Sequence, residues 1–188
     1  MSAFPKAYAD VVAKLRVPFG FVLVIAFAWM AEPSARSMMI GLPVALLGLL
    51  LRGWATGHLE KNIRLARSGP YAYVRNPLYL GTLTVAAGLV IAARRWPLAG
   101  LFSAVFILIY LPVIELEEQH LGKLFPEFGD YSARVPALRP VLHPLRSTQN
   151  FRWELYVRNR EHQALLGFIA GAAFLAAKML LRPGSAHP

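Results

Sequence analysis

Five long apolar blocks limit what this chain can fold into more than any other feature of its sequence. They cover residues 17–31, 38–55, 78–93, 97–114 and 163–181. A helix needs roughly 20 apolar residues to cross ~30 Å of hydrocarbon, so most blocks are long enough and the shorter ones can recruit flanking turns. Apolar residues make up 56% of the chain and charged residues 16%. We therefore predict an all-α integral membrane protein with about five transmembrane helices and additional interfacial helices.

The basic residues are distributed unevenly around these blocks. The chain carries 20 Lys and Arg against 10 Asp and Glu. With five spans, residues 1–16, 52–75 and 115–162 share one side of the membrane, and 15 of the 20 Lys and Arg residues lie there. The positive-inside rule then predicts a multi-pass protein of the inner (cytoplasmic) membrane with its N-terminus in the cytoplasm. Basic residues distributed in this way are expected to interact with the membrane surface. Their distribution argues against nucleic acid as a partner.

Short segments between the blocks complete the expected architecture. Residues 3–16 and 151–160 combine apolar and charged residues at helical spacing, which is typical of helices lying in the membrane interface. Pro18 permits a bend between the first of these helices and the first span. Residues 94–97, with two arginines, Trp96 and a proline, predict a tight turn, so the third and fourth spans form a hairpin.

The last apolar block contains Gly167 and Gly171 at a spacing that lets another helix approach closely. This small-residue face would permit a helix–helix dimer. We see no internal repeat and no low-complexity linker, so we expect a single domain over residues 1–188.

The stretch GPYAYVRNPLYLG, residues 69–81, is a polar and rigid segment at the start of the third block. Pro70 and Pro77 keep the residues before them out of the helical region. Asn76 is a favoured N-cap and Pro77 suits the first helical position, so the third span is predicted to begin here. The N-terminus of a helix presents free N–H groups and the positive end of a dipole, which also makes it an anion site.

Glu117 and Glu118 form a second polar cluster where the fourth span ends. The predicted hairpin brings this helix end next to the helix start at Asn76, on the cytoplasmic side. Neighbouring residues on a helix lie about 100° apart, so we expect only one of the two carboxylates to face the site. A positive helix start, tyrosine hydroxyls and carboxylates together suit a ligand that carries an α-amino acid and a ribose.

These residues resemble the signature of a known family. Residues 69–81, Glu117-Glu118-x-x-Leu121 and Tyr131-x-x-Arg134-Val135-Pro136 are similar to motifs of the isoprenylcysteine carboxyl methyltransferases and the related membrane phospholipid methyltransferases. The resemblance covers roughly residues 40–140 and leaves the block at 163–181 as an extra C-terminal transmembrane helix. It implies a membrane enzyme that uses S-adenosyl-L-methionine to methylate a lipid-like acceptor, with its active site on the cytoplasmic side.

The resemblance also implies roles for individual residues. The cofactor-binding residues would be Ile63, Arg64, Leu65, Ala66, Tyr71, Asn76, Pro77, Leu78, Tyr79 and Glu117. The candidate catalytic residues are Glu117, Arg75 and Tyr79, and the candidate substrate-binding residues, in a lid, are Tyr131 and Arg134. Of the two adjacent carboxylates, the resemblance selects Glu117. We expect no metal, because Glu117-x-x-His120 lacks the second such pair and the further glutamates that a di-iron site requires.

The sequence departs from the family pattern at two positions that bear on the chemistry. Asn76 stands where the family usually has His, and Asn keeps hydrogen-bonding capacity without titrating near neutrality. Val113 stands where the prenylcysteine enzymes have an arginine that meets the substrate carboxylate. Burying a carboxylate without a cation is costly. We therefore expect an amine- or hydroxyl-bearing lipid as the acceptor, in place of a prenylcysteine carboxylate.

Two alternative functions remain open from the sequence. A sterol-reductase-like membrane oxidoreductase would bind NADPH. It would need a larger pocket and a basic cluster that binds phosphate, and the polar segments of this chain are too short to form them. A non-catalytic, methyltransferase-like membrane sensor would bind the cofactor without turnover.

Overall fold

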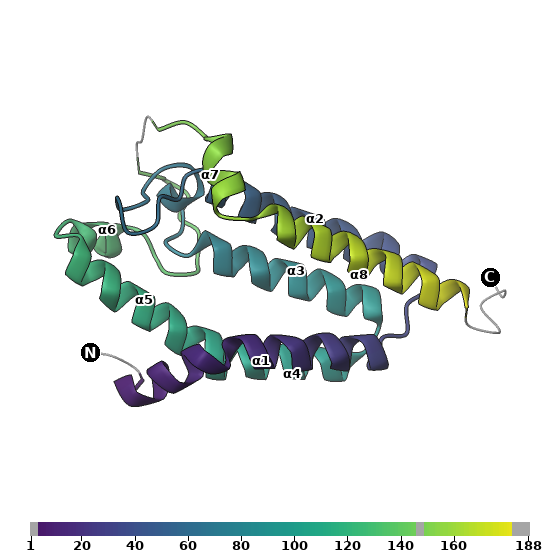
Figure 1. Cartoon of the computed structure of the whole chain (residues 1–188). Coiled ribbons are helices and arrows are strands. Elements are labelled where there is room, and N and C mark those ends of the chain that lie inside the picture. The colour runs from purple at the N-terminus through teal and green to yellow at the C-terminus, as the bar shows by residue number, and fades with distance from the viewer. Residues whose placement is uncertain (1–3, 146–148, 182–188) are drawn as a thin grey trace.

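The computed structural model describes residues 4–145 and 149–181, which fold into a bundle of long helices with a loop-rich end (Figure 1). Four helical segments are long and apolar enough to cross a membrane: Ala7–Met30, Ala35–Thr56, Trp96–Leu124 and His162–Leu180. A fifth apolar helix, Pro77–Ala93, has 17 residues and is shorter. The predicted all-α, multi-pass membrane architecture is confirmed.

The elements follow the order of the predicted blocks. They are α1 (Lys6–Met30), α2 (Ala35–Thr56), the 3-10 turn η1 (Gly69–Ala72), α3 (Pro77–Ala93), α4 (Trp96–Val105), the π-helical segment η2 (Phe106–Tyr110), α5 (Leu111–Leu124), α6 (Phe128–Arg134), α7 (Trp153–Arg158) and α8 (His162–Leu180). The segments α4, η2 and α5 run on as one rod. We use "loop end" for the end of the molecule that carries η1, α6 and α7.

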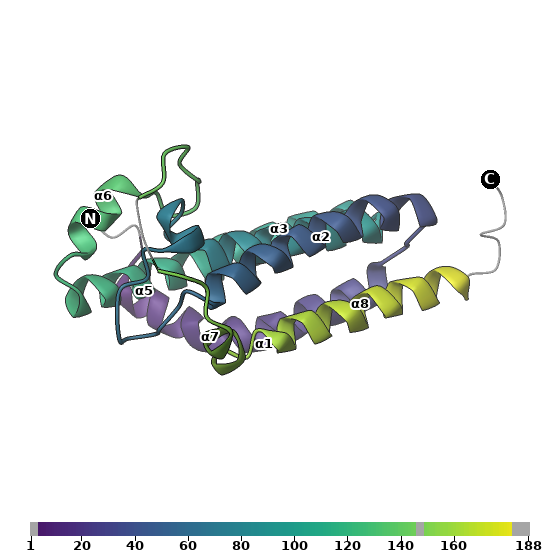
Figure 2. The ribbon, with the colours of Figure 1, turned by 90° about the horizontal axis from the view of Figure 1, so that it is seen from above.

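Helices α2 and α3 lie side by side along their whole length in both views (Figures 1 and 2). Glycines allow this close approach. A Cβ at Gly48 of α2 would lie 2.6 Å from the carbonyl oxygen of Gly81 in α3, and one at Gly88 would collide with the amide nitrogen of Ala45. Larger residues at these positions would push the two helices apart.

Helix α1 packs against the rod formed by α4, η2 and α5. Its Val12 and Leu23 share a buried cluster with Val105, Ile109 and Val113. The expected interfacial helix is not a separate element, because α1 is one continuous helix that contains Pro18 and joins this segment to the first span. The packing of α1 along the rod on both sides of the proline explains why the helix continues.

A proline in the rod creates a hydrogen bond between these helices. Pro112 has no N–H to donate to the carbonyl of Leu108, four residues earlier. The hydroxyl of Tyr8 in α1 donates to this carbonyl at 2.6 Å. The π-helical segment η2 ends just before the proline, and such local irregularities often occur at functional sites.

The turn between α3 and α4 forms as predicted. Arg94 adopts a left-handed conformation with φ of 55°, and α4 begins at Trp96. The two arms of the hairpin then separate, because α3 follows α2 whereas α4 and α5 follow α1 (Figure 1). This separation leaves room at the loop end, between the start of α3 and the end of α5.

The segment near residue 151, expected to be an interfacial helix, forms the short helix α7, and the last apolar block forms α8. Leu175 of α8 is buried with Phe27 and Ala31 of the α1 end. Gly167 and Gly171 face open space, because a Cβ added at either position would have no atom of the described residues within 4 Å. The single chain therefore gives no support to the dimer expected from these two glycines.

Candidate active site

The room between α3 and α5 is a cavity of about 850 Å³ at the loop end. Both polar motifs line it. Nine of the ten expected cofactor-binding residues contribute to its wall: Arg64, Leu65, Ala66, Tyr71, Asn76, Pro77, Leu78, Tyr79 and Glu117. The tenth, Ile63, has 62% of its surface exposed and does not line the cavity. Its assignment to the site is therefore not supported by the geometry.

Glu118 joins the two motifs. Its carboxylate accepts hydrogen bonds from Arg75 Nε at 3.1 Å, from Arg75 Nη2 at 2.9 Å and from Asn76 Nδ2 at 2.7 Å. Arg75 Nη1 also donates to the carbonyl of Ser132, at 2.7 Å. Charge-assisted, bidentate contacts of this kind are strong and fix geometry. Arg75, a candidate catalytic residue, is therefore held between the start of α3 and the segment after α5.

Asn76 does not cap α3 in the expected way. Helix α3 begins at Pro77 as predicted, but the side chain of Asn76 makes no capping hydrogen bond to the helix. Its amide donates to Glu118 instead. The Asn76 side chain bonds to the carboxylate of Glu118 on α5, which is charged and therefore a stronger hydrogen-bond acceptor than a neutral backbone group. The backbone amides at the start of α3 are thus left without a cap from Asn76.

Glu117 has different surroundings, although it is the next residue along the helix. Its carboxylate lies 3.9 Å from Arg16 of α1, and its side chain is 51% exposed. The hydroxyl of Tyr79 lies near Glu117 and Arg16. Because the cavity wraps around the end of α5, both adjacent carboxylates line it, and the expectation that only one would do so is wrong. Glu118 is fully engaged by α3, whereas Glu117 remains accessible.

Arg16 and Tyr110 are cavity residues that sequence reasoning missed. Tyr110 packs edge-to-face against Tyr79, with ring centroids 6.0 Å apart. Val113, by contrast, is buried against α1 and does not line the cavity. Nothing local in the sequence links residue 16 to residue 117, so the expectation built on Val113 left out a cation from another helix. The cavity does contain a basic side chain on its α1 side.

Two buried tyrosines form the loop side of the cavity. Tyr131 donates its hydroxyl to the carbonyl of Tyr71 at 2.8 Å. Burial raises the pKa of both phenols far above the ordinary value of about 10. Both hydroxyls therefore stay protonated over the whole physiological range, and they can orient a ligand but not act as bases.

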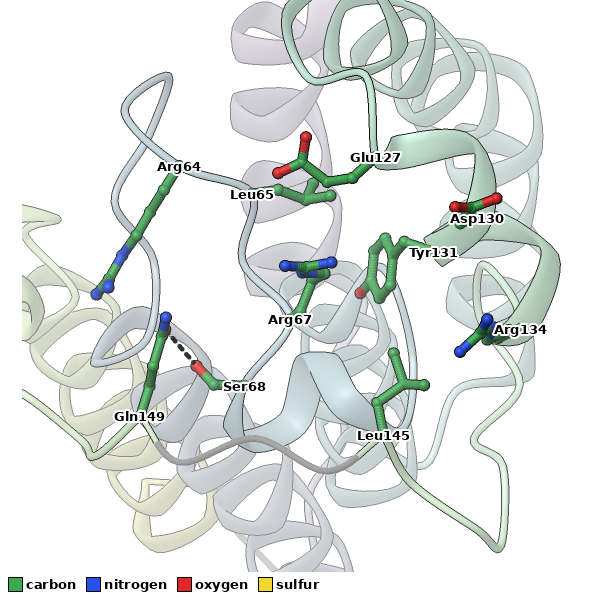
Figure 3. A pocket seen from close by; sticks show the side chains of 10 residues that line it. All are labelled: Arg64, Leu65, Arg67, Ser68, Glu127, Asp130, Tyr131, Arg134, Leu145 and Gln149. Atoms are coloured by element: carbon green, nitrogen blue, oxygen red, sulfur yellow. Dashed lines mark hydrogen bonds between the residues drawn. The ribbon is translucent and has the colours of Figure 1, made fainter.

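Arg134 lies apart from this cavity. It lines a second pocket of about 580 Å³, together with Arg67, Glu127, Asp130 and Ser68 (Figure 3). Tyr131 contributes to both pockets, so the two expected lid residues are not brought together over the cofactor site. Within the described ranges, no group of three or more His, Asp or Glu side chains could hold a metal ion.

Comparison with known protein families gives a match over the same part of the chain. Residues 38–127 match the phospholipid methyltransferase family. The match contains most of α2, all of α3 and the rod, and the motifs at residues 69–81 and 117–121, whereas α1, α6, α7 and α8 lie outside it. Arg16 therefore reaches the cavity from a helix that the family match does not include.

Three curated relatives of this chain are informative. The chain is 33% identical over 131 residues to the cobalt-zinc-cadmium resistance protein CzcN of Cupriavidus metallidurans. The aligned region covers 69% of the chain and 58% of the relative. The chain is 32% identical over 125 residues to the nickel-cobalt-cadmium resistance protein NccN of Alcaligenes xylosoxydans xylosoxydans, covering 65% and 57%. It is 26% identical over 143 residues to a protein-S-isoprenylcysteine O-methyltransferase of Schizosaccharomyces pombe, covering 73% and 60%.

The chain thus spans less than two thirds of the length of these relatives. No solved structure matches it. The resemblance expected from the motifs is confirmed at the level of the family, and the assignments of single residues rest on the cavity geometry alone.

Proposed function

We propose that this protein is a membrane methyltransferase that transfers a methyl group from S-adenosylmethionine to a hydrophobic or amphipathic acceptor. The observation that carries the proposal is the cavity of about 850 Å³ in which both family motifs meet. The family match and the isoprenylcysteine methyltransferase relative support methyl transfer, and they do not favour the reductase or the sensor. The proposed site is on the cytoplasmic side, since the cavity lies at the loop end where most of the basic residues are found.

The donor set of the cavity fits the proposed cofactor. Leu80 donates its N–H to the carbonyl of Asn76, which leaves the amides of Leu78 and Tyr79 in the first turn of α3 for a carboxylate. The accessible carboxylate of Glu117 suits an ammonium group. Tyr71, Tyr79 and the apolar side chains of Leu65 and Leu78 offer a surface for the rest of the molecule. Each polar part of the cofactor would thus have a partner of opposite character.

The remaining chemistry requires little from the protein beyond positioning. When bound, the cofactor would supply an activated methyl group, and a lone pair on the acceptor heteroatom would form the new bond as the carbon–sulfur bond breaks and its electron pair stays on sulfur. The protein holds the two reactants in line and keeps water away. Tyr110 and Arg16 lie on the α1 side of the cavity, and we assign them to the acceptor. An acceptor with an N–H or O–H group would release its proton during the transfer.

The test uses the purified protein in detergent. We expect S-adenosylhomocysteine to bind in a calorimetric titration, and we expect methyl transfer from labelled S-adenosylmethionine to membrane lipid extracts or to farnesylcysteine analogues. Comparing the two acceptors shows whether the enzyme methylates a membrane lipid or a farnesylcysteine carboxylate. Both are tested because Arg16 places a cation in the cavity that could pair with a carboxylate. Absence of S-adenosylhomocysteine binding by a well-folded sample would refute the proposal.

The metal-resistance names of two relatives suggest a physiological setting. We propose that the activity contributes to growth in the presence of cobalt, zinc or cadmium. Loss of the protein should then lower the tolerated concentration of one of these metals, and the Glu117→Gln variant should fail to restore it. Equal tolerance in the presence and absence of the protein would argue against this setting.

A further inference from the structure

The segment from Phe151 to Glu161 lies against the wall of the cavity, although it is outside the family match. It contains α7 and leads into α8, and both views show α7 at the loop end (Figures 1 and 2). We use "strap" for residues 151–161. The cavity wall in question is residues 57–66, which follow α2 and include four of the expected cofactor residues, those at positions 63–66. The contacts between strap and wall have no role in the proposed chemistry.

The strap ends in a buried ion pair. Arg52 of α2 donates from Nε and Nη2 to the two carboxylate oxygens of Glu161, at 2.7 and 2.9 Å. Glu161 is only 5% exposed. Its carboxylate is thus neutralised by a bidentate partner, which is the geometry that a buried charge requires.

The same arginine reaches the helix that carries the proposed cofactor site. Arg52 Nη1 donates to the hydroxyl of Thr82 at 2.6 Å and to the carbonyl of Leu78 at 3.4 Å. Arg52, Leu78 and Thr82 all line the cavity. The guanidinium therefore connects the strap, α2 and the first turns of α3, and Glu161 offsets the positive charge that it brings to the cavity.

Two further contacts hold the wall itself. The amide of Asn159 donates to the carbonyls of Thr56 and Leu59, at 3.1 and 3.0 Å. These carbonyls lie at and just beyond the end of α2, where the helical hydrogen-bond pattern stops, and the carbonyl of Thr56 also accepts from the N–H of Leu59 at 3.3 Å. Arg152 forms an ion pair with Glu60, and its backbone N–H donates to the carbonyl of Gly57 at 3.0 Å. The wall is thus tied to the strap by backbone and by side chains.

We propose that Glu161 and Asn159 are positioning residues for the cofactor site, which act through Arg52 and through the backbone of residues 56–59. The strap fixes the start of α3 and the 57–66 wall in the arrangement that binds the cofactor. This inference rests on the proposed function. It assigns a role in that function to the C-terminal part of the chain, which the family match does not reach.

The test compares variants at the two ends of α8. Glu161→Gln and Asn159→Ala remove the strap contacts, and Lys178→Met is the matched control. Lys178 fastens the far end of α8 by donating to the carbonyls of Ala28 and Trp29, at 2.6 and 3.0 Å, away from the cavity. We expect the strap variants to weaken S-adenosylhomocysteine binding about tenfold or more, since small misplacements of binding groups have effects of that size. The Lys178→Met variant should bind like the wild type.

Hydrogen exchange provides a second measurement that does not depend on any ligand. In the strap variants, amides of residues 57–66 should exchange about tenfold faster, while those of the α2–α3 contact remain protected. A wild-type protein that fails to bind S-adenosylhomocysteine would refute the proposed function, and the exchange pattern would still decide whether the strap holds the wall. Unchanged exchange at residues 57–66, or equal weakening by Lys178→Met, would overturn the inference.

Discussion

The difference between Glu117 and Glu118 shows how strongly surroundings determine the role of a residue. Both are glutamates in the middle of α5, and both line the cavity. Glu118 gives both of its oxygens to Arg75 and Asn76, whereas Glu117 is half exposed beside Arg16. We assign Glu118 to holding the two motifs together and Glu117 to binding a ligand.

This assignment leads to a prediction for cofactor binding. Glu117→Gln or Tyr79→Phe should weaken S-adenosylhomocysteine binding by about 1–3 kcal/mol, the cost of losing one buried polar or charged hydrogen bond. Isothermal titration of the detergent-solubilised variants measures the change. Glu115→Gln is the matched control, because Glu115 lies on the same helix and does not line the cavity. Unchanged affinity in both test variants would place the cofactor elsewhere.

His58 allows a prediction about pH. Its Nδ1 lies 2.9 Å from the hydroxyl of Ser68, and its ring packs against Phe151. Burial, and then the nearby Arg64, lower the pKa of His58 below its ordinary value of 6.5. The folded state thus favours the neutral ring, and the unfolded state binds the proton more readily. Stability that is present above about pH 6.5 should be lost as the pH falls toward the lowered folded pKa.

Thermal unfolding in detergent tests the role of His58. The melting temperature of the wild type should fall between about pH 7.5 and about pH 5.5, and the fall should be smaller in a His58→Asn variant, which cannot titrate there. Identical pH profiles for the two proteins would show that His58 is not responsible.

Among the helices, the contact between α2 and α3 has the tightest geometry in the described part of the bundle. Gly41 and Gly48 of α2 face Gly88 and Gly81 of α3, with no room for a side chain between the backbones. This contact fixes where α3 starts relative to the end of α2. Arg52 and the first turn of α3 can therefore meet at the cavity.

A pair of glycine substitutions tests this packing. Gly48→Leu should destabilise the protein by about 1–3 kcal/mol or more, because overpacking displaces backbone that cannot yield. Gly171→Leu should have little effect on the monomer, since its position in α8 opens onto free space within the described structure. Melting temperatures of both variants in the same detergent decide the matter. Similar destabilisation by both would mean that α8 has a tight neighbour as well.

For the molecule as a whole, five spans and an uneven charge distribution imply an orientation in the membrane. The loop end carries the cavity and receives the three segments in which 15 of the 20 Lys and Arg residues lie. We propose that this end faces the cytoplasm, as the positive-inside rule implies. A reporter fused after Pro188 should then read extracytoplasmic, and one inserted after Pro140 should read cytoplasmic. The same reading from both reporters would contradict the five-span topology.

The spans and several of their boundaries could be predicted from the amino-acid sequence alone. The thickness of the bilayer sets the length of an apolar helix, so block length and hydropathy are sufficient to find it. Local rules also placed the start of α3 at Pro77 and the turn at Arg94, because proline and the residues around it restrict the backbone directly. The resemblance to a family signature selected the expected cofactor residues, and all of them except Ile63 line one cavity.

The meeting of residues from distant parts of the chain became visible only in the folded molecule. Arg16 approaches Glu117, and Arg52 pairs with Glu161 across 109 positions. The fold also determines that α1 continues through Pro18 and that Asn76 bonds to Glu118 instead of capping its own helix. Such contacts depend on how whole helices pack, and a local pattern of residues carries no information about a partner that a different helix brings near.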